Sequence, residues 1–439
     1  MAISLHVEHG DAPTEKFAAG TVAALLRPLQ LLMAWPSLWF LLALTAMLLR
    51  HPDVAFYEID RVALGLLVVG VLARAMMQRR RIVPLERIAL PMLGLILLTV
   101  SSALQQPFEN ETWSLLASKF IVPFLLFHLA GLVFDEEKRF RHFEIFAALV
   151  LAYLSFTSIA FLAGMRSLIF PRFILDESLG FQPERARGPL LQAVANGVSL
   201  SILGMLVLHA FRRDSLRGFK IVLLLASIPV AILATMTRTV WFTFAAAVIA
   251  LIFRTGNRML KRTCIGVTAI SAVTIGFALS CHDFGGVLTD RFEEPGPIDY
   301  REAMYAGGWE MFLERPLTGW GFHQMPAELP RHVIGYHEKV LYPHNTYLEL
   351  LVEHGVIGLA LYVWLMWEMW KLGRGAIPVG EEHSFLDRDF HRLWPILLAV
   401  YWVNAAMVVM SYQFVNGLLS SLAGMLAAQR RRALGFSIC

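Results

Sequence analysis

A series of long apolar runs constrains this chain more than any other feature of its sequence. Hydrophobic residues make up 57% of the 439 residues and charged residues only 16%, whereas an ordinary soluble domain carries roughly 25% charged residues. This composition excludes a disordered chain and argues against a soluble one, because a single core cannot bury so much apolar surface. The runs lie at about 25–49, 62–77, 88–104, 117–134, 144–163, 190–211, 221–236, 240–253, 263–281, 346–370, 393–412 and 414–429. The sequence therefore predicts an all-α, polytopic integral membrane protein with about twelve transmembrane helices.

The basic residues predict how these helices are oriented. If the N-terminus is cytoplasmic, the connections on the cytoplasmic side together with the C-terminal tail contain 22 Lys and Arg residues, and the connections on the outer side contain 12. Lys and Arg concentrate in the cytoplasmic loops of membrane proteins, so this alternation favours that orientation. The basic clusters are then topology signals and lipid headgroup contacts, and they do not indicate nucleic-acid binding.

The alternation divides the chain into five segments. We expect a cytoplasmic segment at 1–24 without a cleaved signal peptide, helices one to nine at 25–281 with an outer loop at 164–189, a large outer loop at 282–345, helices ten to twelve at 346–429, and a cytoplasmic tail at 430–439. Long loops are usually functional or disordered. In the second loop, residues 299–313 predict an amphipathic helix on the membrane face, and Pro316, Gly319 and Gly321 predict a turn after it.

Several classes of site find no support in the sequence. Cys264, Cys281 and Cys439 form no disulfide or zinc framework, and no phosphate-binding glycine loop, dinucleotide fingerprint or serine nucleophile elbow occurs. The competing hypothesis of a metal site in the second outer loop lacks any recognised ligand spacing. The histidines available for it are His323, His332, His337, His344 and His354. We therefore expect no metal and no cofactor.

Arginines recur where the spans meet the outer surface. Arg185 and Arg187 precede Gly188-Pro189, Arg238 lies in a short junction between two apolar runs, and Arg301 follows Tyr300 in the second outer loop. The planar guanidinium suits phosphate, and a charge at membrane depth needs a partner or a function. Each arginine also has a structural alternative. Arg185 and Arg187 could snorkel to the membrane interface, Arg238 could lie at a solvated hairpin tip, and Arg301 could pair with a nearby carboxylate.

A histidine opens the tenth span. Pro343-His344-Asn345 leads into residues 346–370, and the positive end of a helix lowers the pKa of an imidazole, as a general base requires. Glu353 follows nine residues later, roughly 13 Å along the helix. An acidic residue inside an apolar span is a functional or paired residue by default.

Taken in order, these motifs resemble those of the bacterial O-antigen ligase and polymerase family. The motifs are Arg185-Ala186-Arg187-Gly188, Thr237-Arg238, Arg301 with Pro316-Leu317-Thr318-Gly319-Trp320-Gly321, and His344-Asn345 through Glu353, Gly355 and Gly358. The resemblance covers about residues 180–370. It implies a glycosyltransferase of the bacterial inner membrane that acts in lipopolysaccharide biosynthesis, with its active site on the periplasmic face.

The resemblance also implies substrates and roles. The donor would be a glycan on undecaprenyl diphosphate, transferred en bloc to an acceptor such as lipid A-core, without a metal and with inversion. His344, Arg238 and Arg301 would be catalytic, with His344 as the base and the arginines on the diphosphate. Arg185, Arg187, Asn345 and Glu353 would bind substrate, and it stays open which of Arg185 and Arg187 faces the site.

Three other functions remain open at this point. A polymerase would join lipid-linked repeat units and differ only in its acceptor. A transporter of anionic lipid-linked glycans would use the cationic pocket for binding without chemistry. A scaffold of a secretion complex would use the second outer loop as a docking surface, and its arginines would be silent in glycan assays.

Overall fold

The computed structural model describes residues 33–52, 57–78, 85–180, 182–254, 296–333, 344–381 and 383–435, together with scattered residues between 258 and 276. Within this part of the chain every regular element is a helix and no strand occurs, which confirms the all-α prediction. The helices are α2 (Pro36–Leu48), α3 (Tyr57–Met77), α4 (Ala89–Ala103), α5 (Asn110–Leu116), α6 (Val122–Val133), α7 (Glu137–Leu162), α8 (Ala193–Arg212), α9 (Phe219–Ala234), α10 (Arg238–Arg254), α13 (Gly296–Glu314), α14 (Met325–His332), α15 (Thr346–Leu372), α16 (Arg388–Ala405) and α17 (Gln413–Ala433).

The apolar runs largely coincide with these helices. Four segments are long and apolar enough to cross a membrane, namely Asn110–Val133, Glu137–Leu162, Ala193–Arg212 and Thr346–Leu372. α2, α4 and α9 are shorter apolar helices, and the run at 263–281 lies mostly outside the described residues. The composition and these four helices indicate a membrane protein. The count of about twelve spans, the orientation and the five segment boundaries remain predictions.

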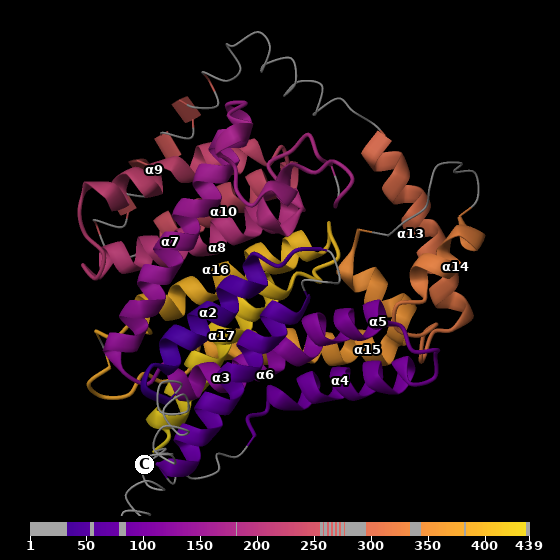
Figure 1. Cartoon of the computed structure of the whole chain (residues 1–439), viewed down its shortest axis with the longest axis horizontal. Helices are drawn as coiled ribbons and strands as arrows, with labels where there is room; N and C mark the ends of the chain where they lie inside the picture. The colour runs from indigo at the N-terminus through magenta and orange to yellow at the C-terminus, as the bar shows by residue number, and fades with distance from the viewer. Residues whose placement is uncertain are drawn as a thin grey trace, which may run out of the picture.

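α17 lies at the centre of the bundle, as Figure 1 shows. Its residues are buried almost without interruption from Gln413 to Gln429, and its closest packing is against α6. A Cβ at Gly424 would lie 1.9 Å from the carbonyl oxygen of Phe127. Glycine is therefore needed where α17 crosses α6, as at other close crossings of membrane helices.

The run expected at 393–412 is helical only as far as Ala405. The residues between α16 and α17 instead follow an irregular path, in which the carbonyl oxygen of Val408 accepts a hydrogen bond from Thr346 Oγ1 at 2.8 Å. Irregular backbone inside a membrane protein is tolerated where it is buried in protein or lines a cavity. This stretch does line a cavity, described below.

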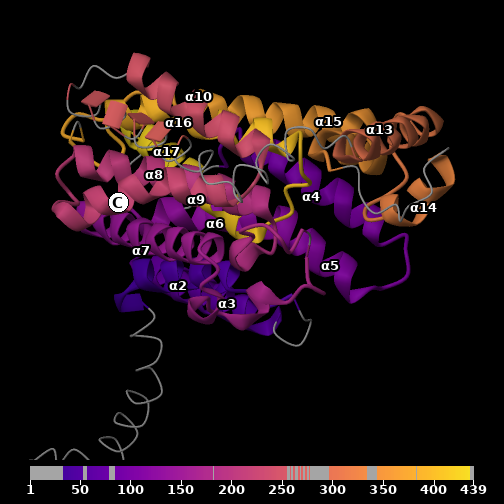
Figure 2. The same cartoon turned by 90° about the horizontal axis from the view of Figure 1, so that it is seen from above.

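α13 and α14 lie together at one end of the molecule, beside the first turns of α15 (Figures 1 and 2). The helix expected over 299–313 is present as α13. Its buried residues fall at 304, 307, 308 and 311, the spacing of one helix face. That face packs on α14 and α15 through an apolar cluster of Met304, Met311, Met325, Leu329, Leu348 and Val352. Its placement on a membrane surface remains a prediction.

Candidate functional site

α15 is interrupted in its first half, at Gly355. This residue has φ 63° and ψ −163°, a backbone conformation that is essentially restricted to glycine. The break frees the amide of Val356, which donates to the carbonyl oxygen of Pro316 at 2.8 Å. A Cβ at Gly355 would lie 2.2 Å from the carbonyl oxygen of Leu317. The two backbones are therefore in direct contact at this point.

The turn after α13 supplies the other partners that the interrupted helix lacks. The amide of Trp320 donates to the carbonyl oxygen of Val352 at 2.8 Å, and the amide of Gly321 donates to that of Glu353 at 3.0 Å. Gly319 has φ 72°, and a Cβ there would lie 2.4 Å from the carbonyl carbon of Glu353. The expected turn thus docks into the broken helix, because buried backbone groups must find partners.

His344 and Asn345 immediately precede α15, as expected. Asn345 is the N-cap, and its side-chain oxygen accepts hydrogen bonds from the amides of Tyr347 at 3.0 Å and Leu348 at 3.2 Å. The Asn345 side chain therefore stabilises the start of the helix. His344 has φ 48°, in the left-handed region that few residues other than glycine adopt.

The imidazole of His344 is partly buried and lies near the positive charge of Arg301. Burial, and secondly the charge of Arg301, lower the pKa of His344 to about 4. Its ring centroid lies 5.7 Å from that of Tyr300. The imidazole is thus neutral at pH 7, which a general base requires. The sequence predicted this neutrality from the helix end, whereas burial is the larger cause.

His344 and Glu353 line one cavity of about 310 Å³. It lies between the first turns of α15, the segment just before α8, and the irregular stretch between α16 and α17. Its lining also contains other polar side chains, namely Lys119, Gln192, His323, Glu349 and Ser411. Arg185, Arg187, Arg238 and Arg301 are not among its lining residues.

Lys119 reaches this cavity from a single turn of π-helix, η2 (Ala117–Ile121), between α5 and α6. Pro123 follows, and its missing N–H cannot bond the carbonyl of Lys119, which favours the wider turn. Lys119 forms a salt bridge with Glu349, and each side chain is 7% exposed. Single π-turns are frequent at functional sites.

Glu353 lies one helical turn beyond Glu349 on the same face of α15. Its side chain is buried, and its Oε1 accepts a hydrogen bond from the amide of His323 at 2.9 Å. Its Oε2 is buried and makes no hydrogen bond within the described part of the chain. Burying a polar atom without a partner costs free energy, so this oxygen is a candidate contact for a ligand.

Arg187 is bound within the loop at 164–189. Its side chain is almost fully buried, and its guanidinium donates to the carbonyl oxygens of Ile174 at 2.9 Å, Asp176 at 2.8 Å and also Leu179. Three carbonyl partners fix the loop around this one side chain. Of the two arginines whose roles were open, Arg187 therefore stabilises the loop, while Arg185 lies 3.3 Å from Glu184 and is partly exposed.

Arg185 and Arg238 lie on neighbouring segments. The amide of Ala186 donates to the carbonyl oxygen of Ala234 at 3.2 Å, which joins the loop to the junction that precedes Arg238 at the start of α10. Arg301 lies on α13, close enough to His344 to influence its protonation. The structure thus brings His344 together with Glu353 and Arg301, and brings the Arg185 segment next to that of Arg238.

Lys119 and Glu349 were not predicted as site residues from the sequence. Lys119 lies inside the apolar run at 117–134, and an ionisable residue in such a run is a functional candidate by default. Glu349 precedes Glu353 by four residues, so the two share a helix face. Either signal could have identified this pair.

No three His, Cys, Asp or Glu side chains within the described ranges are placed to hold a metal ion. Of the histidines considered for such a site, His337 lies outside those ranges. His332 instead lies 3.1 Å from Glu314, and His354 lies 3.3 Å from the hydroxyl of Thr99.

A comparison with protein families finds that residues 221–363 match a family described as O-antigen ligase. No curated protein matches the chain. The matched segment contains Arg238, Arg301, His344, Asn345 and Glu353, and it ends within α15. The resemblance to the O-antigen ligase family is therefore confirmed over residues 221–363.

Proposed function

We propose that this protein is an inner-membrane glycosyltransferase of lipopolysaccharide biosynthesis. It transfers a glycan en bloc from undecaprenyl diphosphate to a hydroxyl of an acceptor such as lipid A-core, on the periplasmic face. The family match supports glycan transfer of this type. The observation that carries the proposal is the partly buried, neutral imidazole of His344, a residue of the matched segment that lines a cavity.

In the proposed reaction His344 accepts the proton of the acceptor hydroxyl while that oxygen attacks the anomeric carbon. The bond from the anomeric carbon to the phosphate oxygen breaks, and the diphosphate leaves with the electron pair. Arg238 and Arg301 stabilise the charge that develops on the leaving group, with Arg185 in support. A single displacement of this kind inverts the anomeric configuration. Permanently charged guanidinium groups serve here in place of a metal ion.

The test is a transfer assay with purified protein, undecaprenyl-diphosphate-linked glycan and lipid A-core. His344→Ala is expected to abolish transfer while donor binding is retained, because the base is lost and the arginines remain. His332→Ala, which removes a histidine of α14 outside the cavity lining, is the matched control. Product formation by His344→Ala at the wild-type rate would refute the general-base assignment.

A polymerase of lipid-linked repeat units is the second candidate, because it would use the same donor and the same base. The same assay with a lipid-linked glycan as the acceptor separates the two activities. If the wild-type protein binds the donor and transfers to neither acceptor, the transporter hypothesis replaces both.

A further inference from the structure

The cavity that contains His344 has an acid-rich lining. Apart from histidines, its lining contains two glutamates, Glu349 and Glu353 on α15, and one lysine, Lys119 on η2. Two carboxyl groups against one lysine leave no excess positive charge to attract a diphosphate. Carboxyl oxygens are hydrogen-bond acceptors, and hydroxyl groups are the donors that suit them. The lining thus fits a sugar better than a phosphate.

Glu353 lines this cavity and has one buried carboxyl oxygen with no hydrogen-bond partner among the described residues. The residue is only 2% exposed, its Oε1 is occupied by the amide of His323, and its Oε2 lacks a hydrogen-bond partner among the described residues. A hydrogen bond from a ligand to this acceptor would stabilise the complex, because the acceptor was already removed from water when the protein folded.

Glu349, by contrast, already forms a salt bridge with Lys119. Lys119 neutralises it, and the Lys119 Nζ lies 5.7 Å and 5.9 Å from the ring centroids of Phe120 and Phe322. These contacts hold the lysine in place by charge and by cation–π attraction. The ion pair therefore shapes the cavity, and Glu353 remains as the acidic group with a vacant acceptor.

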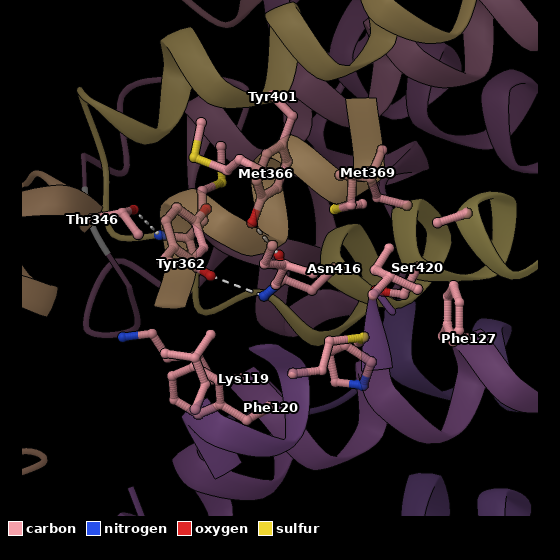
Figure 3. Close-up of a pocket in the computed structure, with 18 of the residues that line it drawn as sticks. Lys119, Phe120, Phe127, Thr346, Tyr362, Met366, Met369, Tyr401, Asn416 and Ser420 are labelled. Carbon is pink, nitrogen blue, oxygen red and sulfur yellow. Dashed lines mark hydrogen bonds between the residues drawn. The ribbon is translucent and has the colours of Figure 1, made fainter. Parts of the chain in front are cut away.

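Lys119 also contacts a second cavity, which is mainly apolar. Figure 3 shows Lys119 and Phe120 at the edge of a second cavity, across from Tyr362 and Met366 of α15. This second cavity holds about 80 Å³ and is lined mainly by apolar side chains. Lys119 lines both cavities. Apolar surroundings on one side strengthen the ion pair by lowering the local dielectric.

We infer that the cavity of about 310 Å³ is the acceptor subsite, and that Glu353 Oε2 accepts a hydrogen bond from a sugar hydroxyl of the acceptor. The inference rests on the proposed function and assigns this cavity to the acceptor, with the donor diphosphate outside it on the arginine side. The attacking hydroxyl gives its proton to His344. A second hydroxyl of the same acceptor keeps its proton and donates a hydrogen bond to Glu353, so Glu353 positions the sugar.

The first test compares Glu353→Gln with the wild type in steady-state transfer from undecaprenyl-diphosphate-linked glycan to lipid A-core. The amide oxygen of Gln still accepts from His323, whereas its NH₂ group replaces the vacant acceptor. We expect the KM for lipid A-core to rise about twofold to tenfold, the range for a hydrogen bond between uncharged groups, with the KM for the donor unchanged. Glu368→Gln is the control, since Glu368 is also a buried acid of α15 but is paired with Lys371 and lines neither cavity.

The second test uses the wild-type protein and core acceptors that each lack one sugar hydroxyl, so it does not depend on the folding of a variant. One such acceptor is expected to lose about the same factor as Glu353→Gln, and the variant is expected to lose nothing further with it. An unchanged acceptor KM in folded Glu353→Gln would overturn the inference, and a rise in the donor KM alone would reassign the cavity to the donor. If the wild type transfers glycan to neither lipid A-core nor lipid-linked glycan, the proposed function fails first.

Discussion

Replacement of Gly355 by alanine tests whether the docking of the turn into α15 stabilises the protein. The backbone of Gly355 lies in a region that costs a residue with a Cβ about 1–3 kcal/mol. The new Cβ would also lie 2.2 Å from the carbonyl oxygen of Leu317, and relief of such overpacking costs about 1–3 kcal/mol more. We therefore expect Gly355→Ala to destabilise the protein by about 2–6 kcal/mol.

The assay is the apparent Tm of the purified protein in detergent. A change of 1 kcal/mol lowers Tm by roughly 2–4 °C in a domain of 150–250 residues and by less in a larger one, so Gly355→Ala should melt several degrees below the wild type. Gly319→Ala should lower Tm in the same way, because its new Cβ would lie 2.4 Å from the carbonyl carbon of Glu353. Gly65→Ala is the control, because a Cβ at this position of α3 meets no atom within 4 Å. If Gly355→Ala and Gly319→Ala both have the same Tm as Gly65→Ala, the backbone contact between the turn and α15 does not stabilise the protein.

Two further predictions concern the arginines. Arg301→Gln removes a positive charge that opposes protonation of His344, so the pKa of His344 should rise from about 4 towards 6.5. Because burial is the larger cause, the acid limb of the pH–rate profile should move to higher pH by roughly one unit or less; a shift to lower pH would contradict this. Arg187→Met leaves three carbonyl oxygens without their charged donor, so we expect a loss of at least about 2 kcal/mol and faster proteolysis of the 164–189 loop. Equal proteolysis of Arg187→Met and of the exposed Arg217→Met would contradict the assigned role.

The sequence was sufficient for the features that depend on neighbours along the chain. Apolar runs predicted where helices lie, because the transfer of apolar side chains from water is a local free energy that adds along a segment. Asn345 next to His344 marked a helix start, and Pro316 with two glycines marked a turn, for similarly local reasons. The early end of α16 at Ala405 was not visible in this way, because the apolar run continues beyond it.

Tertiary structure alone decided which of the charged residues face a common cavity. Lys119 and Glu349 are 230 positions apart, and only the tertiary fold brings their side chains together as partners. Arg185 and Arg187 look alike in the sequence, yet Arg187 is buried among carbonyl oxygens of its own loop while Arg185 lies beside Glu184. The physical reason is that the energy of a charge depends on every dipole and charge around it, and most of these come from distant parts of the chain.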